Sequence, residues 1–354
     1  MNRRLLWVVA LRLNRVSQNN KYEHMSVQEF IQNNTQAERR EQNHMHSAMT
    51  LQKLIQSSSD IPHPGEGQTL KRWQMLAQIA AVDLNLVKWF ESHLDALSIL
   101  HELGYTAKND AIYAVWAAEG SAQPLSVHDG YCQGIKAWCS GAGIVEKALM
   151  TYRDEHKQAQ MILVDLRDAN IQIDHSIWQA VGMAQTATAN ITFHQVAVEK
   201  IAQPNAYLNR PGFWHGAAGV AACWYGATQR LAQQLFHQLQ NKPHPFKAMY
   251  LGEISTALHV NRQHFHAVAE CIDQHPQQTH EYKIRMLRQF TEQTSRLVIE
   301  KVGLALGAAP FCQDGHFASL ATDLSVFIRQ THGAFDLEQI GELAIHQEEE
   351  QWIL

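Results

Sequence analysis

Apolar residues recur every three or four positions from Leu70 to Leu103, which is the spacing of one face of an α-helix. The pattern stops at Gly104, and a Pro-Gly break at residues 62–65 separates it from a shorter apolar face nearer the N-terminus. We therefore predict two or three amphipathic helices, which form a reduced N-terminal helical domain over residues 47–108.

Short β-prone runs replace the helical spacing in the middle of the chain. Residues 111–116, 161–166 and 189–198 are rich in β-branched and aromatic side chains. Polar or glycine breaks separate such runs at intervals of about ten residues, as small antiparallel barrels and sandwiches require. We predict an all-β middle domain over residues 109–205, built as a small antiparallel barrel or sandwich.

Long helical patterns return after Pro204 and continue to the end of the chain. The predicted helices cover about 216–240, 245–273, 281–306 and 317–331, and a shorter one follows Asp336. Helices of this length with short Pro-Gly connections favour an up-and-down helix bundle over residues 206–354. The fold class is therefore α+β, with helices first, then a β-domain, then a bundle.

The first 46 residues have a different texture, dominated by Gln and Asn between Gln18 and Asn43. Polar segments with little apolar periodicity bury too little surface to fold alone. We predict that residues 1–46 are a disordered tail, or a start placed too far upstream, since Met25 and Met45 could each begin the protein. A targeting or interaction arm is the alternative.

Composition and charge exclude several classes of protein. The chain has 354 residues, of which 45% are hydrophobic and 18% charged, so it is neither wholly disordered nor fibrous. A net charge of −5 gives no electrostatic reason to expect nucleic acid. Five cysteines without a CxxC pair indicate reduced thiols and a cytoplasmic location. No apolar run approaches the ~18 residues that a membrane helix needs, so we predict no membrane association.

The order of these domains, together with local strings, resembles the acyl-CoA dehydrogenase superfamily of flavoproteins. Residues 134–142 (GIKAWCSGA) resemble its Gly-x-Lys-x-Trp-x-(Thr/Ser)-x-(Gly/Ala) stretch, and residues 178–189 (WQAVGMAQTATA) its Leu-Gly-Met-Arg-x-(Thr/Ser) segment. Residues 91–96 (ESHLDA), and Asp323 with the residues up to Gly341, look more like the flavin-monooxygenase branch. The resemblance covers roughly residues 68–345, and it implies that the middle domain is an antiparallel β-barrel.

The resemblance implies a flavin beside Trp138 and Ser140. Side chains two apart on a strand share a face, so these two would face one ligand while Cys139 points away. An indole can exclude water from the flavin ring, and the family implies that Ser140 donates a hydrogen bond near flavin N5. A core tryptophan with a satisfied serine is the alternative.

The implied cofactor is FAD, with its pyrophosphate held by a neighbouring subunit. The family's Arg-aromatic pair corresponds to Lys242 and Phe246, before a helix whose free N–H groups could meet an anion. The family's glycine turn corresponds to Gly303 and Gly307, although a helix C-cap at Gly307 explains that turn equally well.

The sequence departs from the family pattern at the reacting groups. Trp116 stands where the family has a hydroxyl near the flavin pyrimidine edge. The carboxylate that would remove the substrate's α-proton is absent from both usual positions, which align with residues 331–332 and 214–222. Asp336, Glu338 and Glu342 follow shortly after and read as a solvated helix face.

His332 is the predicted catalytic residue, because a neutral imidazole can act as an acid or base in flavin chemistry. A surface histidine is the alternative reading, and His215 is a weaker second candidate. Residues His259, His264 and His266 lack metal-ligand spacing with a carboxylate, so we predict no metal site.

The leading prediction is an FAD-dependent oxidoreductase that transfers hydride from the CH–CH group of an acyl thioester, such as an acyl-CoA, to flavin. We expect it to assemble as a homodimer or homotetramer. The first alternative is a two-component monooxygenase that uses O₂ and reduced FMN or FAD as co-substrate. The second is a catalytically silent structural or regulatory homologue.

Overall fold

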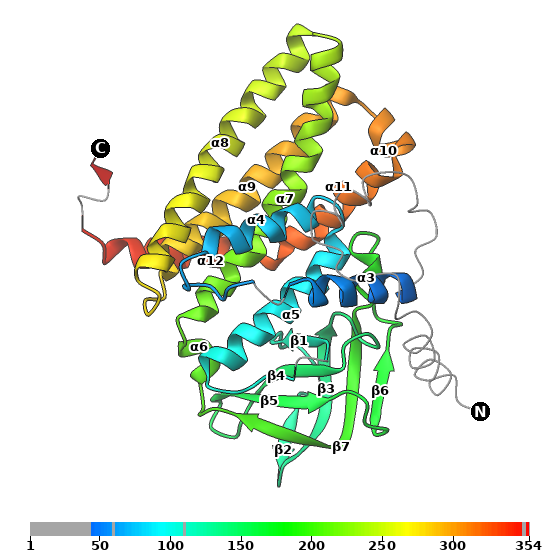
Figure 1. The fold of residues 1–354 in the computed structure, drawn as a ribbon, viewed down its shortest axis with the longest axis vertical. Coiled ribbons are helices and arrows are strands. Elements are labelled where there is room, and N and C mark those ends of the chain that lie inside the picture. The colour runs from blue at the N-terminus through cyan, green and yellow to red at the C-terminus, as the bar shows by residue number, and fades with distance from the viewer. Residues whose placement is uncertain (1–43, 59–60, 109–110, 349–351, 354) are drawn as a thin grey trace.

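The computed structural model describes residues 44–58, 61–108, 111–348 and 352–353, so nearly all of the predicted 1–46 tail lies outside the described residues. A β-sheet forms one end of the molecule and long helices form the other (Figure 1). Helix α5 (Leu84–Glu102) crosses between these two layers. Within the described part of the chain, no helix combines the length and the hydropathy that a membrane span needs.

The N-terminal helices are α3 (His44–Gln56), α4 (Thr69–Ala80) and α5. Asp83 caps α5, because its carboxylate accepts hydrogen bonds from the backbone N–H groups of Asn85 and Leu86 at 2.9 and 3.1 Å. Almost every residue of α5 from Leu84 to Leu100 is buried, although the helix carries several polar side chains. A helix buried all round must find partners for those polar groups inside the protein.

The middle domain contains seven strands. They are β1 (Tyr113–Trp116), β2 (Ser126–His128), β3 (Tyr131–Cys139), β4 (Lys147–Arg153), β5 (Ala159–Asp165), β6 (Ile171–Asp174) and β7 (Ala189–Ile201). Their order is β1-β4-β5-β7-β3-β2, with β6 also paired to β7. The sheet is mixed, because β1 and β4 pair in parallel, so the prediction of purely antiparallel pairing is wrong. The sheet is also not closed, so the predicted barrel is not confirmed.

Side chains of helix α5 accept hydrogen bonds from the backbone of the edge strand β1. The backbone N–H of Val115 donates to Ser92 Oγ at 2.9 Å, and that of Tyr113 donates to His93 Nδ1 at 3.0 Å. These side chains satisfy donors that an open edge would leave without a partner. Burial lowers the pKa of His93 to about 4, so this imidazole is neutral.

The C-terminal region contains α6 (Ala206–Asn209), α7 (Gly212–Asn241), α8 (Pro245–Gln274), α9 (Glu281–Leu306), α10 (Ala309–Gln313), α11 (Gly315–Phe327) and α12 (Ala334–Ile345). Helices α7, α8 and α9 run up and down side by side (Figure 1), as predicted. The predicted 317–331 helix is shorter than expected, because α11 ends at Phe327 and a 3₁₀ turn over Ile328–Gln330 follows.

The close contact between α4 and α7 depends on a glycine. A Cβ built on Gly226 would lie 2.0 Å from the carbonyl oxygen of Ala77 in α4. The opposing atom belongs to a helix backbone, so it cannot move aside as a flexible side chain could. Gly252 in α8, by contrast, has no heavy atom within 4 Å of such a Cβ.

We expect Gly226→Ala to lower the free energy of unfolding by at least ~2 kcal/mol, because the two helices must separate. Gly252→Ala is the matched control and should raise it by up to ~1 kcal/mol, since alanine is the better helix former. Urea unfolding followed by circular dichroism measures both. Equal stability of the two variants would contradict this close contact.

Candidate functional site

The family-like string at the end of β3 contains a kink. The pairing of β3 with β7 shifts register between Lys136 and Cys139, and Trp138 has a φ of 61°. A left-handed conformation is costly for a bulky residue, and it interrupts the regular alternation of side chains. Trp138 is therefore turned outward, 56% exposed, while Cys139 is fully buried. Its indole lies edge-on to that of Trp178, with ring centroids 6.0 Å apart.

A chain of three hydroxyl groups begins next to this indole. Ser140 Oγ lies 2.9 Å from Thr188 Oγ1, which lies 2.8 Å from Thr186 Oγ1. Thr186 Oγ1 in turn donates to the carbonyl oxygen of Met183 at 2.8 Å. A carbonyl can only accept, so each hydroxyl must pass its proton in the same direction. Ser140 thus donates to Thr188, and its lone pairs remain as acceptors.

Trp116 supports the backbone of the same turn. Its indole Nε1–H donates to the carbonyl oxygen of Ser140 at 3.0 Å, and its ring is buried. Trp116, which stands where the resembling family has a hydroxyl, therefore holds the backbone of Ser140 in place. The structure brings Trp116, Trp138 and Ser140 together.

The segment before β7 is anchored to the bundle through Asp323 in α11. The Asp323 carboxylate accepts hydrogen bonds from the backbone N–H of Met183 and from Asn85 Nδ2 of α5, the latter at 2.9 Å. Gly182 allows this contact, since a Cβ there would lie 2.2 Å from the carbonyl oxygen of Thr322. Burial raises the pKa of Asp323 to about 6.

One face of α5 carries buried charges at helical spacing. Glu91 is 7% exposed, and its Oε2 lies 3.6 Å from Lys88 Nζ. Asp95, one turn further along, is partly buried and lies 3.9 Å from Arg210 Nη2. Burial raises the pKa values of both Glu91 and Asp95. Both separations lie within ion-pair range but beyond hydrogen-bond distance, so these carboxylates are loosely paired with Lys88 and Arg210.

Three cations lie around this face of α5, two of them buried and the third, Arg288, partly buried. Arg72 and Arg210 are buried, and both favour the ionised form of Asp95. Arg288 of α9 lies over the Trp224 ring at 4.8 Å, and burial lowers its pKa to about 10. Arg210 also pairs closely with Glu102, with 2.7 Å between Nη1 and Oε2. Groups with perturbed pKa values are enriched at functional sites, so this charged interior is a candidate site.

Trp116, Trp138 and Ser140 lie at the seam between the sheet and the bundle. The other predicted site residues do not lie at this seam within one chain. The side chain of His332 is 74% exposed and lies 4.0 Å from Asp336 Oδ2. His215 is buried, and its Nε2 lies 2.9 Å from the carbonyl oxygen of Gln278. Lys242 and Phe246 flank the α7–α8 turn, at the end of the bundle away from the sheet (Figure 1).

Gly303 and Gly307 belong to the C-terminal end of α9. Gly307 follows the last residue of the helix with a φ of 68°, and its N–H donates to the carbonyl oxygen of Gly303. This end of α9 also lies away from the sheet (Figure 1). Contacts of these glycines with a flavin therefore stay a prediction that requires a second subunit.

Sequence reasoning missed the buried carboxylates of α5 as candidate site residues. A signal was present, because Lys88, Glu91 and Asp95 recur at helical spacing between the apolar positions of this helix. Such a stripe reads as a solvated face until the neighbours of the helix are known. Only the packing of α5 between the sheet and the bundle shows that it is buried.

No protein-family model matches the chain, and no curated protein matches it by sequence. Solved structures do match. Butyryl-CoA dehydrogenase from Megasphaera elsdenii gives a TM-score of 0.72 at 12% identity, over 86% of this chain and 90% of that one. TdsC from Paenibacillus sp. A11-2, in complex with FMN and indole, gives 0.66 at 17% identity, over 86% and 97%. KijD3, with FMN and a dTDP-sugar, gives 0.69 at 14% identity, over 86% and 87%.

These matches show that the chain has the acyl-CoA dehydrogenase fold, so the resemblance read from the sequence is confirmed at the level of the fold. The neighbours belong to both branches named above, since TdsC is a dibenzothiophene monooxygenase. At sequence identities of 12–17%, this structural similarity shows the fold alone.

Asp323 offers a test of the anchor between the sheet and the bundle. Ionised Asp323 weakens the folded state, because its folded pKa of about 6 lies above the ordinary value of about 4. Its contribution to stability is therefore lost as the pH rises from about 4 to 6. Asp323→Asn keeps an acceptor for Met183 N–H, and Asn85 Oδ1, which has no partner among the described residues, can accept from the new amide.

We expect Asp323→Asn to exceed the wild type in unfolding free energy by about 1–3 kcal/mol above pH 6, and this difference to shrink as the pH falls to 4. Asp323→Ala should lose about 1–3 kcal/mol near pH 4, since it leaves Met183 N–H without a partner, and this loss should shrink as the pH rises to 6, because the variant lacks the ionising group. Urea unfolding over this pH range tests both. A difference for Asp323→Asn that does not change with pH would contradict the burial of this charge.

Proposed function

We propose that this protein is a flavin-dependent oxidoreductase whose flavin ring binds at the seam between the sheet and the bundle. The observation that carries the proposal is the exposed indole of Trp138 beside the hydroxyl chain that begins at Ser140. An outward-facing aromatic surface with a hydrogen-bonding group at its edge suits a planar heteroaromatic ring. Val181, 85% exposed in the neighbouring segment, adds apolar surface.

A bound flavin would supply hydride or electron transfer, which no side chain can provide. The residues of this chain would orient the ring and exclude water from it. Trp138 would cover one side, and Ser140 would contact the ring edge. Trp116 and Asp323 act behind them, because they fix the backbone of the turn and of the 182–188 segment.

The direction of the hydroxyl chain favours reduced flavin as the bound species. Reduced flavin carries an N–H at N5 and needs an acceptor there, whereas oxidised flavin needs a donor. Ser140 has donated its proton to Thr188, so it offers an acceptor. We therefore infer a monooxygenase that takes up reduced FMN or FAD and uses O₂. This reverses the preference for a dehydrogenase drawn from the sequence.

Anaerobic titration of the purified protein with reduced and oxidised FMN and FAD tests this proposal. We expect reduced flavin to bind at least tenfold more tightly than oxidised flavin. Thr188→Val removes the acceptor for the Ser140 proton, so Ser140 can donate outward and the preference should fall towards one. Thr192→Val, in the strand β7 that follows Thr188, is the control and should keep the preference. Tighter binding of oxidised flavin would overturn the monooxygenase assignment, and binding of neither form would leave a catalytically silent homologue.

Dehydrogenation of an acyl thioester is the second candidate, and Glu91 is the observation that favours it. A buried carboxylate with a raised pKa is a suitable base for a substrate proton. Glu91 lies on the face of α5 that also carries Asp95, which meets the start of α7, where a Cβ on Gly216 would touch Asp95 Oδ1. Bleaching of the flavin absorption by acyl-CoA without oxygen would support this reaction.

Glu91→Gln and His332→Ala separate the two candidates for the proton-transfer residue. We expect Glu91→Gln to slow turnover at least ~100-fold, because a general acid or base is lost. His332→Ala should change turnover less than about twofold, since its side chain is exposed and beside Asp336. The opposite pattern would return the role to His332.

We further propose that the flavin phosphates are held across a subunit contact. Phe246 is 73% exposed, and Met249, Val260 and Leu304 also expose apolar surface on α8 and α9. This apolar surface supports a homodimer or homotetramer, in which Lys242 and Gly307 of one subunit could meet the flavin of another. Light scattering after size-exclusion chromatography would report a monomer if this is wrong.

A further inference from the structure

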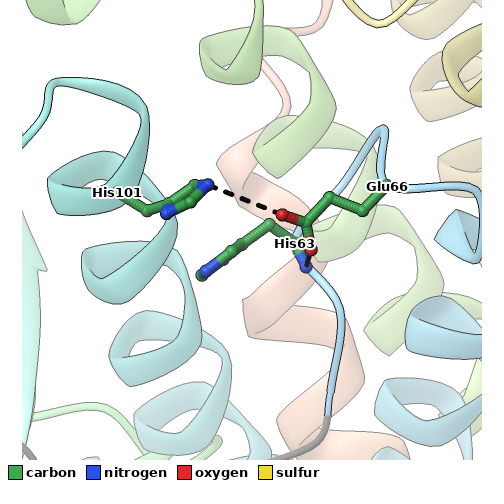
Figure 2. A group of neighbouring side chains, drawn as sticks. All are labelled: His63, Glu66 and His101. Atoms are coloured by element: carbon green, nitrogen blue, oxygen red, sulfur yellow. Dashed lines mark hydrogen bonds and ion pairs between the residues drawn. The ribbon is translucent and has the colours of Figure 1, made fainter.

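A cluster of two histidines and one glutamate lies outside the seam, where the segment before α4 meets the C-terminal end of α5. His63 and Glu66 belong to that segment, and His101 belongs to the last turn of α5 (Figure 2). One potential ligand atom from each residue lies within 4.8 Å of the other two. Imidazole nitrogens with one carboxylate are a donor set that suits divalent zinc.

The tautomer of His63 is fixed by its neighbours. Ser98 Oγ–H donates to the carbonyl oxygen of Leu94 at 2.9 Å, so this hydroxyl can only accept from its other partners. Arg72 Nη2 donates to it at 3.2 Å, and His63 Nδ1 lies 2.9 Å away. His63 Nδ1 must therefore carry the proton, which leaves the lone pair on Nε2. Metal-binding histidines are commonly oriented by such a hydrogen bond from the other ring nitrogen.

The carboxylate of Glu66 is also oriented by a hydrogen bond. Its Oε2 accepts from the backbone N–H of His63 at 2.8 Å, and its Oε1 lies 3.5 Å from His101 Nε2. Two ligands of a tetrahedral zinc ion, each at 2.0–2.1 Å, lie about 3.3 Å apart. The Oε1–Nε2 separation is thus close to one edge of such a site.

The two imidazole rings need one movement before they can share an ion. They are stacked at 15° with centroids 4.4 Å apart, so their lone pairs lie in nearly parallel planes and do not converge on one point. The His101 side chain is 62% exposed, and its Nε2 lies 3.5 Å from Glu66 Oε1, at the limit of a hydrogen bond, so its ring can turn. His63 and Glu66 are already oriented and need not move.

We propose that His63, Glu66 and His101 bind a divalent zinc ion that joins the segment before α4 to the end of α5, with the remaining coordination position open to water. This site revises the sequence-based expectation of no metal, which considered only histidines of one helix. It lies apart from the flavin seam and does not depend on the proposed function.

Zinc titration of the untagged, EDTA-treated protein tests the site, with a chromophoric chelator as competitor. We expect one equivalent of Zn²⁺ to bind, and His101→Ala and Glu66→Gln each to weaken that binding at least tenfold. Both side chains reach the surface, so neither variant should disturb folding. Ser98→Ala should weaken binding about tenfold, because His63 loses the acceptor that fixes its tautomer.

The double variant His259→Ala/His266→Ala is the matched control, since it removes two exposed histidines of α8. It should bind zinc within twofold of the wild type. Zinc should also raise the melting temperature of the wild type by about 2 °C or more, and not that of His101→Ala. Equal zinc affinity of the wild type and His101→Ala, or loss of binding in the α8 control, would overturn the proposal.

Discussion

Helix α5 is buried on nearly every side, yet it carries polar and charged residues along much of its length. The rest of the structure depends on how these polar groups find partners. A buried polar group must be hydrogen-bonded or paired, because removing it from water is otherwise costly. Ser92 and His93 meet this requirement by accepting from the edge strand β1, and Asn85 does so by donating to Asp323 of α11. The polar groups of α5 thus fix the sheet on one side and the bundle on the other.

Helix α5 also holds the segment before β7, which lies at the seam between the sheet and the bundle. Trp89 donates its indole N–H to the carbonyl oxygen of Thr186 at 2.8 Å, and Thr186 is the last member of the hydroxyl chain that begins at Ser140. The kinked end of β3, the segment before β7 and the helix are therefore held as one unit. A site built on such a unit can hold its polar groups in one orientation, and the proposed preference for reduced flavin depends on this.

The charges that face the bundle are different, because they are not closely paired. Glu91 and Lys88 lie beyond hydrogen-bond distance, and so do Asp95 and Arg210. Replacing such groups with apolar residues of similar size often leaves a protein equally or more stable. Folding alone therefore gives little reason for these carboxylates, and a role in holding or transforming a ligand gives a better one.

The sequence by itself determined the helices and the order of the domains. The predicted spans 245–273 and 281–306 agree with α8 and α9 to within a residue, because apolar periodicity and proline breaks are local signals. The strings at residues 134–142 and 178–189 indicated the family, but they predicted a regular strand at residues 138–140, where the structure has a kink. Only the tertiary structure decided the parallel pairing of β1 with β4, the outward turn of Trp138, and the burial of Glu91. Each of these depends on neighbours distant in the chain, and a stripe of charges reads the same on a solvated helix as on one enclosed by a sheet and a bundle.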